Sequence, residues 1–199
     1  MNRSILLLGI LSILAISCKK QPSEENPNGT LTDSRDGEVY ATIFIGNNNW
    51  MAENLRYQWQ SSTYNSNNPD IIYGRLYNWV AASDACPKGW HLPSNEEWQD
   101  LVDALSATYS EVGTAMKSTT GWTDLGNGTN GSGFNAYPAG SEDSTVNGAL
   151  GNTALFWSAT SSFSPQDAYS KMLSYDTTSI ELNGTRNKND RLSCRCVQD

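Results

Sequence analysis

Residues 86–98, CPKGWHLPSNEEW, carry the strongest structural signal in this chain, a complete start signal for a helix. Ser94 and Glu97 have the spacing of a capping box, in which each side chain accepts a hydrogen bond from the backbone amide of the other residue. Pro93 ends the preceding segment. The apolar residues that follow recur with helical spacing, at Trp98, Leu101, Val102 and Leu105. The pattern predicts an amphipathic helix that begins directly after Ser94.

The charged residues around this helix start have a structural interpretation. Glu96, Glu97 and Asp100 lie in or near the first turn, where the helix dipole favours each negative charge by about 0.3–1 kcal/mol. His91 is the only histidine of the chain, and one histidine cannot build a zinc site of the usual kind. The nucleophile elbow G-x-S-x-G of serine hydrolases does not occur in the sequence. We therefore expect His91 to be hydrogen-bonded beside the helix cap.

The amino-terminal residues resemble the export signal of a bacterial lipoprotein. Arg3 supplies a positive charge, and residues 4–16 form an apolar run of signal-peptide length that is too short to span a bilayer. The run ends in AISC at residues 15–18, which is similar to a lipobox, with alanine where leucine is usual. We expect a signal peptide over residues 1–17 and acylation of Cys18, which would anchor the chain in the bacterial outer membrane, on its periplasmic or cell-surface face. The alternative is an ordinary secretory signal with a chance cysteine.

Composition indicates that the rest of the chain forms one acidic, loop-rich domain. The chain has 199 residues, of which 38% are hydrophobic, enough for one domain with a core. Residues 18–30 are polar, include two prolines and are expected to be a tether, which leaves residues 31–199 for the domain. The formal net charge of −8 and the isoelectric point near 4.6 argue against a nucleic-acid partner, which needs a basic surface.

Strands are predicted at both ends of the domain. Residues 38–45 are β-branched and aromatic between two glycine turns, so they predict a strand, and residues 50–55 are expected to pair or pack with it. Further strands are expected at residues 154–158, 168–175, 179–182 and 191–197, with turn residues at 183–184 and 187–190.

A second helix and a long loop region are predicted between these strands. Leu76, Trp79 and Val80 have helical spacing, so residues 73–82 are expected to form a short amphipathic helix. Residues 113–152 are rich in Gly, Asn, Ser and Thr and are expected to be mostly loop. Two helices packed with antiparallel strands, together with this long loop region, indicate an α+β fold.

One segment of the loop region matches a nucleotide-binding pattern by chance. Residues 126–131, GNGTNG, fit G-x-G-x-x-G. A dinucleotide site also needs a strand before the glycines and a helix after them. No helical pattern follows residue 131, so we do not assign a nucleotide site there.

Six segments follow one another in the order DGEVYATIFIGNNNWMAENLR, YGRLYNWVAA, CPKGWHLPSNEEWQDL, SGFNAYPAG, FWSAT and RCVQD. They span about residues 33–199 and resemble the Fibrobacter succinogenes major paralogous domain family of bacterial secreted proteins and lipoproteins. The resemblance implies a C-type-lectin-like fold. The stretch HLPSNEEW is also similar to a motif of formylglycine-generating enzymes, which share that broad architecture.

The resemblance also implies a pairing of the cysteines. Cys86 and Cys196 match two cysteines of the family, which implies a structural disulfide worth on the order of 4 kcal/mol in the chain-entropy model. With Cys18 lipidated, Cys194 is left over, and we interpret it as a free, mostly buried thiol. A swapped pairing, a redox role and a metal role are the alternatives. Formylglycine-generating enzymes bind copper through a more widely spaced cysteine pair, which the Cys194–Cys196 spacing does not match.

These features favour a cell-envelope lipoprotein that presents a non-catalytic, lectin-like binding or adhesion module for a glycan or protein ligand, without a cofactor or a metal. The calcium-binding Glu-Pro-Asn and Gln-Pro-Asp motifs of sugar-binding C-type lectins do not occur in the sequence. One alternative is a structural envelope or fimbria-like assembly component, which would have a flat apolar contact surface. The other is an enzyme related to formylglycine-generating oxidases, which would have a cleft with perturbed titratable groups.

The part of the long loop region at about residues 121–152 is the predicted location of the ligand-binding surface, because function tends to lie on loops held by a rigid scaffold. It combines aromatic faces with hydrogen-bonding groups that suit a sugar or a peptide. If Trp122 and Tyr137 instead only pin the loop to the core, they should be buried. The candidate ligand-binding residues are Trp122, Asn127, Asn130, Tyr137, Glu142 and Asp143.

Overall fold

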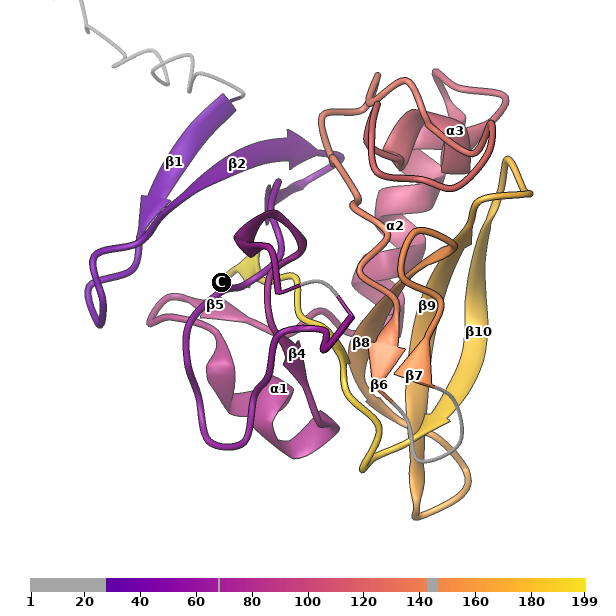
Figure 1. Cartoon of the computed structure of the whole chain (residues 1–199). Helices are drawn as coiled ribbons and strands as arrows, with labels where there is room; N and C mark the ends of the chain where they lie inside the picture. The colour runs from indigo at the N-terminus through magenta and orange to yellow at the C-terminus, as the bar shows by residue number, and fades with distance from the viewer. Residues whose placement is uncertain (1–27, 68, 143–146) are drawn as a thin grey trace, which may run out of the picture.

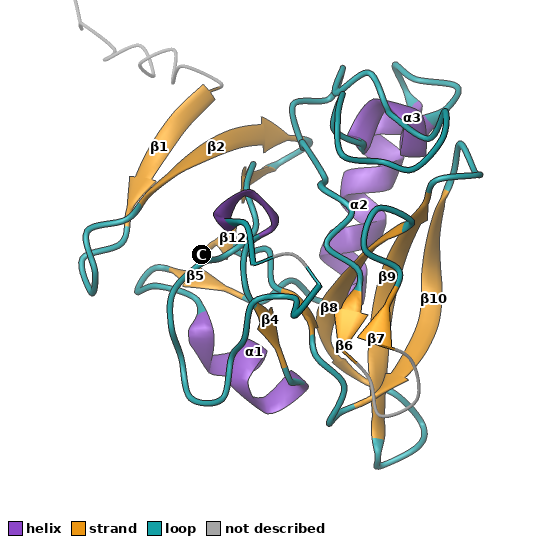
Figure 2. Ribbon diagram, in the orientation of Figure 1, coloured by secondary structure: helices purple, strands orange, loops and turns teal. Residues whose placement is uncertain are grey.

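The computed structural model describes residues 28–67, 69–142 and 147–199 (Figure 1). The predicted signal peptide, the lipidation site Cys18 and the candidate ligand residue Asp143 lie outside the described residues. Within them the chain forms two five-stranded sheets, a two-stranded ribbon and a few short helices (Figure 2). The α+β class predicted from the sequence is confirmed.

The first sheet has the strand order β1-β2-β3-β12-β5. β2 and β3 form the predicted antiparallel pair, with Ile43 opposite Trp50. β1 pairs with β2 and includes residues 28–30, so the tether ends earlier than its polar composition predicts. In Figure 1, β1 and β2 reach out from the rest of the molecule as a ribbon. The strands are β1 (Asn28–Thr32), β2 (Val39–Ile45), β3 (Asn48–Met51), β12 (Val197–Gln198) and β5 (Trp90–His91).

The second sheet has the order β10-β9-β8-β11-β4. The expected turn at residues 183–184 is wrong, because β10 continues through it with a shift of register between Glu181 and Gly184. The strands are β10 (Ile180–Asn187), β9 (Asp167–Ser174), β8 (Thr153–Ser161), β11 (Leu192–Ser193) and β4 (Leu76–Tyr77). A separate ribbon consists of β6 (Ser141–Glu142) and β7 (Asn147–Gly148).

The helix expected at residues 73–82 begins later than its spacing predicts. Residues 71–73 form the 3-10 helix η1 (Ile71–Tyr73), and Leu76 lies in β4. The α-helix α1 (Trp79–Ala85) starts only after Asn78, whose side chain accepts from the Ala81 amide. Its buried face consists of alanines, while Val80 is 55% exposed. The helical spacing of Leu76, Trp79 and Val80 was therefore misleading, because Leu76 lies in a strand and only the other two lie in the helix.

The helix predicted from the capping box is confirmed. α2 (Asn95–Ser106) has Ser94 as its N-cap, and both hydrogen bonds of the box with Glu97 are present. Trp98, Leu101 and Leu105 are buried as the periodicity predicts. A further short helix, α3 (Val112–Met116), lies in the region predicted as loop and has no side-chain cap.

An aromatic cluster joins α2 to both sheets. Trp98 of α2 packs on Trp50 of β3 with ring centroids 5.0 Å apart and on Phe156 of β8 at 5.6 Å. Phe134, from the loop after α3, packs on all three of these rings at 5.8–6.1 Å. All four side chains are inaccessible to solvent, so the long loop is part of the core at this point.

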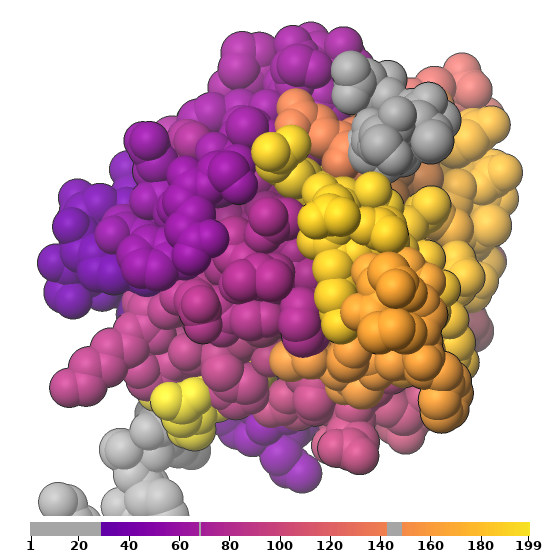
Figure 3. All heavy atoms as spheres, turned by 90° about the horizontal axis from the view of Figure 1, so that it is seen from below, coloured from indigo at the N-terminus to yellow at the C-terminus, as the bar shows by residue number. Residues whose placement is uncertain are grey.

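The segment after β10, at residues 188–191, connects the β8–β9 loop to the start of α1. The Lys188 amide donates to the Gln166 carbonyl, and the Lys188 carbonyl accepts from the Trp79 amide. In Figure 3 this segment (yellow) accordingly lies between the β8–β9 loop (orange) and the magenta region that contains α1. None of the helices in the described part of the chain combines the length and the apolar composition that a membrane span needs.

Candidate functional site

Trp122 lies in the interior. It is 5% exposed, and its indole Nε1 donates to the Ser118 hydroxyl at 3.1 Å and to the Ala136 carbonyl at 3.2 Å. A ligand could not reach this ring without opening the loop. By the criterion of exposure, Trp122 pins the loop to the core.

The two candidate asparagines also hold the loop together. The Asn127 side-chain oxygen accepts from the Trp122 amide at 3.1 Å, and the Asn130 side-chain oxygen accepts from the Asn135 amide at 2.9 Å. Asn130 has a φ of 50°, which asparagine tolerates better than most residues do. Asn127 nevertheless remains exposed, whereas Asn130 is half-buried.

Tyr137 and Glu142 lie in different surroundings from Asn127. Tyr137 is half-buried and packs edge-on against Tyr73, with ring centroids 6.0 Å apart. Glu142 accepts from the Thr63 hydroxyl at 2.7 Å and lies 3.7 Å from the Arg191 guanidinium. The described candidates therefore do not converge on one site, and Asn127 alone among them lines a cavity described next.

An open groove of about 430 Å³ lies between the loop at residues 124–127 and the β9–β10 connection at residues 175–178. The two walls are in close contact, because a Cβ atom on Gly126 would come within 2.6 Å of the Tyr175 Cβ. Glycine is therefore required at residue 126 for this approach. The residues with polar side chains that line the groove are Thr114, Lys117, Asp124, Asn127, Tyr175, Asp176, Thr177 and Thr178.

The buried Lys117 holds the two walls of the groove together by hydrogen bonds. It is 3% exposed, and its ammonium donates to the Ser174 carbonyl at 3.1 Å and to the Thr177 carbonyl at 2.9 Å. The same ammonium lies 5.2 Å from the centroid of the Trp122 ring. Burial lowers the pKa of Lys117 below its usual value. Its hydrogen bonds fix the β9–β10 connection against the loop, so the groove is a preformed feature.

The groove has side chains available for a ligand. Asp124 and Asp176 are exposed carboxylates, and the Asp176 carboxylate accepts from the Ser174 hydroxyl at 2.5 Å. Leu125 is 99% exposed at the rim, and Tyr175 is half-buried. Carboxylates and an amide bind hydroxyl groups by hydrogen bonds, and an aromatic ring or an apolar side chain covers a sugar face or an apolar residue. The arrangement can therefore bind a polar ligand of sugar or peptide size.

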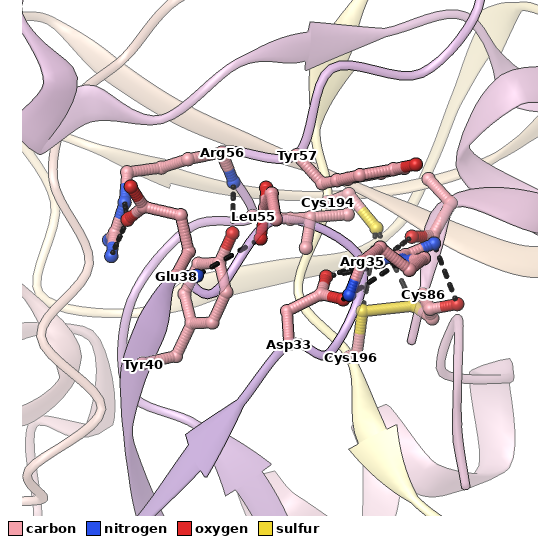
Figure 4. Close-up of polar contacts among 12 residues, drawn as sticks. Asp33, Arg35, Glu38, Tyr40, Leu55, Arg56, Tyr57, Cys86, Cys194 and Cys196 are labelled. Carbon is pink, nitrogen blue, oxygen red and sulfur yellow. Dashed lines mark hydrogen bonds and ion pairs between the residues drawn. A yellow bond between two sulfur atoms is a disulfide. The ribbon is translucent and has the colours of Figure 1, made fainter. Parts of the chain in front are cut away.

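The disulfide expected between Cys86 and Cys196 is confirmed, and it joins the end of α1 to the segment before β12. Cys194 is a free and fully buried thiol, as interpreted from the sequence. Its Sγ atom lies 3.9 Å from that of Cys86 and 4.0 Å from that of Cys196 (Figure 4). Burial raises the pKa of the Cys194 thiol to about 12.

Arg35 covers this cysteine cluster, as Figure 4 shows. Its guanidinium pairs with the buried Asp33 at 2.6 Å, donates to the Ala85 carbonyl at 2.8 Å and lies 3.7 Å from the centroid of the Tyr57 ring. Although burial alone raises the pKa of Asp33, the hydrogen bonds and charge of Arg35 bring it below its usual value. Arg35 thus ties the β1–β2 turn to the end of α1.

His91 occupies the structural position expected from the sequence. Its Nε2 atom lies 2.8 Å from the Glu97 carboxylate, and its Nδ1 atom lies 2.7 Å from the Asp199 carboxylate. The histidine therefore links the capping box of α2 to the end of the chain.

Two features escaped the sequence analysis. Arg195 is 1% exposed and donates to the side chain of Asn54 and to three backbone carbonyls, although its position between two cysteines gave no sign of this role. The groove residue Asp176 lies in the predicted break between two strands, and Tyr175 is the last residue of the strand predicted before it. The break predicted a turn at these residues. Their contact with residues 124–127 could not be predicted, because no local sequence pattern marks a contact between distant segments.

Comparison with known families identifies one relationship. The sequence profile of the Fibrobacter succinogenes major domain matches residues 43–198, which is most of the chain. No curated protein and no solved structure has significant similarity to the chain. The resemblance noted from the ordered sequence segments is confirmed.

Proposed function

Because the chain belongs to the Fibrobacter succinogenes major domain family, we propose that it is a cell-envelope lipoprotein whose domain binds a glycan or protein ligand without catalysing a reaction. The C-type-lectin-like fold that the sequence resemblance implies is part of this proposal. The mixed helix-and-sheet architecture is compatible with it.

The groove beside residues 124–127 carries the proposal. Its walls are held in place by Lys117 and Gly126, so a ligand would not have to order them on binding. Asp124, Asp176 and the exposed Asn127 offer hydrogen-bonding groups beside Tyr175. The lining contains neither histidine nor cysteine, so no Ser-His or Cys-His pair is assembled in it.

A binding array tests the proposal. The mature protein in detergent is applied to immobilised glycans and envelope peptides, together with a variant carrying Asp124→Asn and Asp176→Asn. Both changes keep the size of the side chain and remove its charge. We expect the wild type to retain a defined ligand and the double variant to bind it at least about tenfold more weakly, equivalent to about 1.4 kcal/mol.

The matched control is Asp84→Asn on α1, an exposed carboxylate that does not line the groove. It should bind as the wild type does. Equal binding by the groove variant and the wild type would remove the groove from the proposal, and no retained ligand at all would remove the binding function.

The lipid anchor is tested separately. Metabolic labelling with a fatty-acid analogue should tag the wild-type protein and leave Cys18→Ala unlabelled. Persistence of the label in that variant would contradict anchoring at Cys18, whatever the groove binds.

A second candidate function is structural assembly, favoured by the open edge of the first sheet. Within the described residues β1 pairs on one side only, and Val39 and Phe44 of β2 are 51% and 48% exposed. An edge strand beside exposed apolar side chains can accept a strand from another subunit. Cross-linking on intact cells would then yield a ladder of copies that Phe44→Lys shortens, whereas a monomer in both samples would exclude this candidate.

A further inference from the structure

Three cysteine sulfur atoms meet at one place, and the proposed function uses none of them. The Sγ atoms of Cys86, Cys194 and Cys196 all lie within 4.8 Å of one another, and no other group of three or more metal-ligating side chains is found in the described residues. Cys194 and Cys196 are fully buried and Cys86 is half-buried. In Figure 4 the three side chains point toward one another beneath Arg35.

Cys194 lies beside the disulfide rather than in line with it. Its distances to the two bonded sulfur atoms, 3.9 Å and 4.0 Å, are nearly equal. Thiol–disulfide exchange needs a thiolate that attacks one sulfur along the axis of the bond. The sideways position of Cys194 is therefore unfavourable for a swapped pairing.

The same two distances match those of a metal site. Three thiolates held about 2.3 Å from one closed-shell metal ion lie about 3.8–4.0 Å from one another, whether the geometry is trigonal or tetrahedral. Two of the three sulfur pairs already have this separation. Only the pair joined by the disulfide must move apart.

We propose that reduction of the Cys86–Cys196 disulfide creates a three-thiolate site for one thiophilic closed-shell cation, with Zn²⁺ as its representative. A dithiol reductant supplies two electrons and two protons, which convert Cys86 and Cys196 to thiols, while its own two sulfurs join in a disulfide. Binding of Zn²⁺ then displaces the protons of the three thiols. In the reverse step a small-molecule disulfide accepts the two electrons and two protons and becomes a dithiol. The Cys86 and Cys196 sulfurs then rejoin, the ion is released and Cys194 takes up one proton.

The surroundings suit such a site. A Zn²⁺ ion with three thiolates carries a net charge of −1. Burial disfavours negative charge at Cys194, and the guanidinium groups of Arg35 and Arg195 offset part of that cost. In the metal-free protein the Cys194 thiol donates to the Ala82 carbonyl at 3.9 Å, and binding of Zn²⁺ removes this proton and its hydrogen bond. Because the described residues offer no fourth ligand in this cluster, the fourth position is left to a water molecule or an external thiol.

Metal titration of the full chain tests the inference independently of any groove ligand. Cys18→Ser is present in every sample, so that only the three clustered cysteines can respond. The protein is reduced anaerobically with dithiothreitol, freed of it by gel filtration, and titrated with Zn²⁺ against a chromogenic chelator. Co²⁺ is then used as a reporter, because its thiolate absorption grows with the number of coordinated cysteines.

The reduced wild type should bind one Zn²⁺ per chain, and the oxidised protein should bind none at this site. Cys194→Ser, which keeps the disulfide pair, should bind at least about tenfold more weakly after reduction and give the weaker Co²⁺ absorption of two thiolates. Equal affinity and equal Co²⁺ spectra for these two reduced proteins would overturn the proposal.

The proposal can still be tested if the protein unfolds when its disulfide is reduced. Near-UV circular dichroism is recorded for each reduced sample before and after addition of Zn²⁺. If the reduced metal-free chain is unfolded, Zn²⁺ should restore the native spectrum in the wild type and not in Cys194→Ser. Failure to restore it in the wild type would also overturn the proposal.

Discussion

Helix α2 and the loop of residues 117–140 pair their buried backbone groups in different ways. In α2 the partners are local, since the helix bonds to itself and Ser94 and Glu97 close its first turn within four residues. In the loop some partners lie within the loop and others come from far along the chain. The Phe134 and Asn135 carbonyls accept from Arg195, and the Ala136 carbonyl accepts from the Trp122 indole.

This difference shows where the information for each region is stored. A helix needs a cap and a periodic apolar face, which one short stretch of sequence contains. A buried loop needs donors for its carbonyls, because an unpaired buried carbonyl is costly. Here the Ala136 carbonyl finds Trp122 within the loop, but the Phe134 and Asn135 carbonyls need Arg195. The loop can therefore be completed only when Arg195 is in place.

The largest effect is expected from removing the donor shared by the loop and the first sheet. Arg195→Leu leaves the Met51, Phe134 and Asn135 carbonyls and the Asn54 side chain without this partner. Each unpaired buried group costs about 1–3 kcal/mol, so the free energy of unfolding should fall by about 5 kcal/mol. Urea denaturation followed by circular dichroism measures the change.

Arg186→Leu is the matched control, because Arg186 is exposed on β10. Its free energy of unfolding should stay within about 0.5 kcal/mol of the wild type. Similar losses for the two variants would contradict the role given to Arg195.

A smaller effect on stability is expected from two tryptophan replacements, one in the loop and one in the helix, which compare the two regions directly. Trp122→Phe removes two hydrogen bonds of a buried indole and should cost about 2 kcal/mol. Trp98→Phe on α2 removes none, because the Trp98 Nε1 atom has no hydrogen-bond partner among the described residues.

Trp98→Phe should therefore cost about 1 kcal/mol or less, through packing alone. Thermal denaturation of both variants gives the comparison. A larger loss for Trp98→Phe would show that ring packing, rather than the pairing of the loop carbonyls, decides the stability of both regions.

The helix cap is expected to matter less than either loop donor. Ser94→Ala removes the hydroxyl that accepts from the Glu97 amide at 3.2 Å and should cost about 1 kcal/mol. Ser106→Ala, at the other end of the same helix, removes only an exposed hydroxyl bonded to the Val102 carbonyl and should be nearly neutral. Equal melting temperatures for the two variants would mean that the capping box does not stabilise the folded protein.

The smallest effect is expected from pH at His91. Burial lowers the pKa of His91, but its hydrogen bonds with Asp199 and Glu97 outweigh this and raise the value above normal. The protonated form is thus favoured on folding, so its stabilisation is full below about pH 6.5 and is lost as the pH rises through the folded pKa.

The side chain of His91 is 42% exposed, so solvent screening limits this contribution to about 0.2–1 kcal/mol. Denaturant titrations between pH 5.5 and about 8.5 should show the decline in the wild type, and His91→Gln should flatten it. An unchanged slope in the variant would assign the dependence to another group.

Sequence patterns were sufficient where partners are close together or occur at fixed family positions. The capping box, the β2–β3 pair and the Cys86–Cys196 disulfide were predicted correctly for that reason. The predicted range of helix α1 was several residues too early, because the spacing of Leu76, Trp79 and Val80 gives no sign that Leu76 pairs in a strand.

The candidate site was less predictable. The sequence located aromatic and polar residues in the long loop, but not which of them face outward. Trp122 is buried because its indole serves the loop carbonyls, and the groove depends on Tyr175 and Asp176, about fifty residues farther along the chain. Exposure and tertiary contact of this kind have no periodic signature in the sequence.

The placement of the last strands determines when folding can be completed. β12 lies between β3 and β5 in the first sheet, and β11 lies between β8 and β4 in the second. Both interior strands come from residues 192–198. Until these residues are in place, neither sheet can close and Cys86 lacks its disulfide partner Cys196. Residues 192–198 are therefore needed by both sheets at once, and their removal would leave each sheet divided.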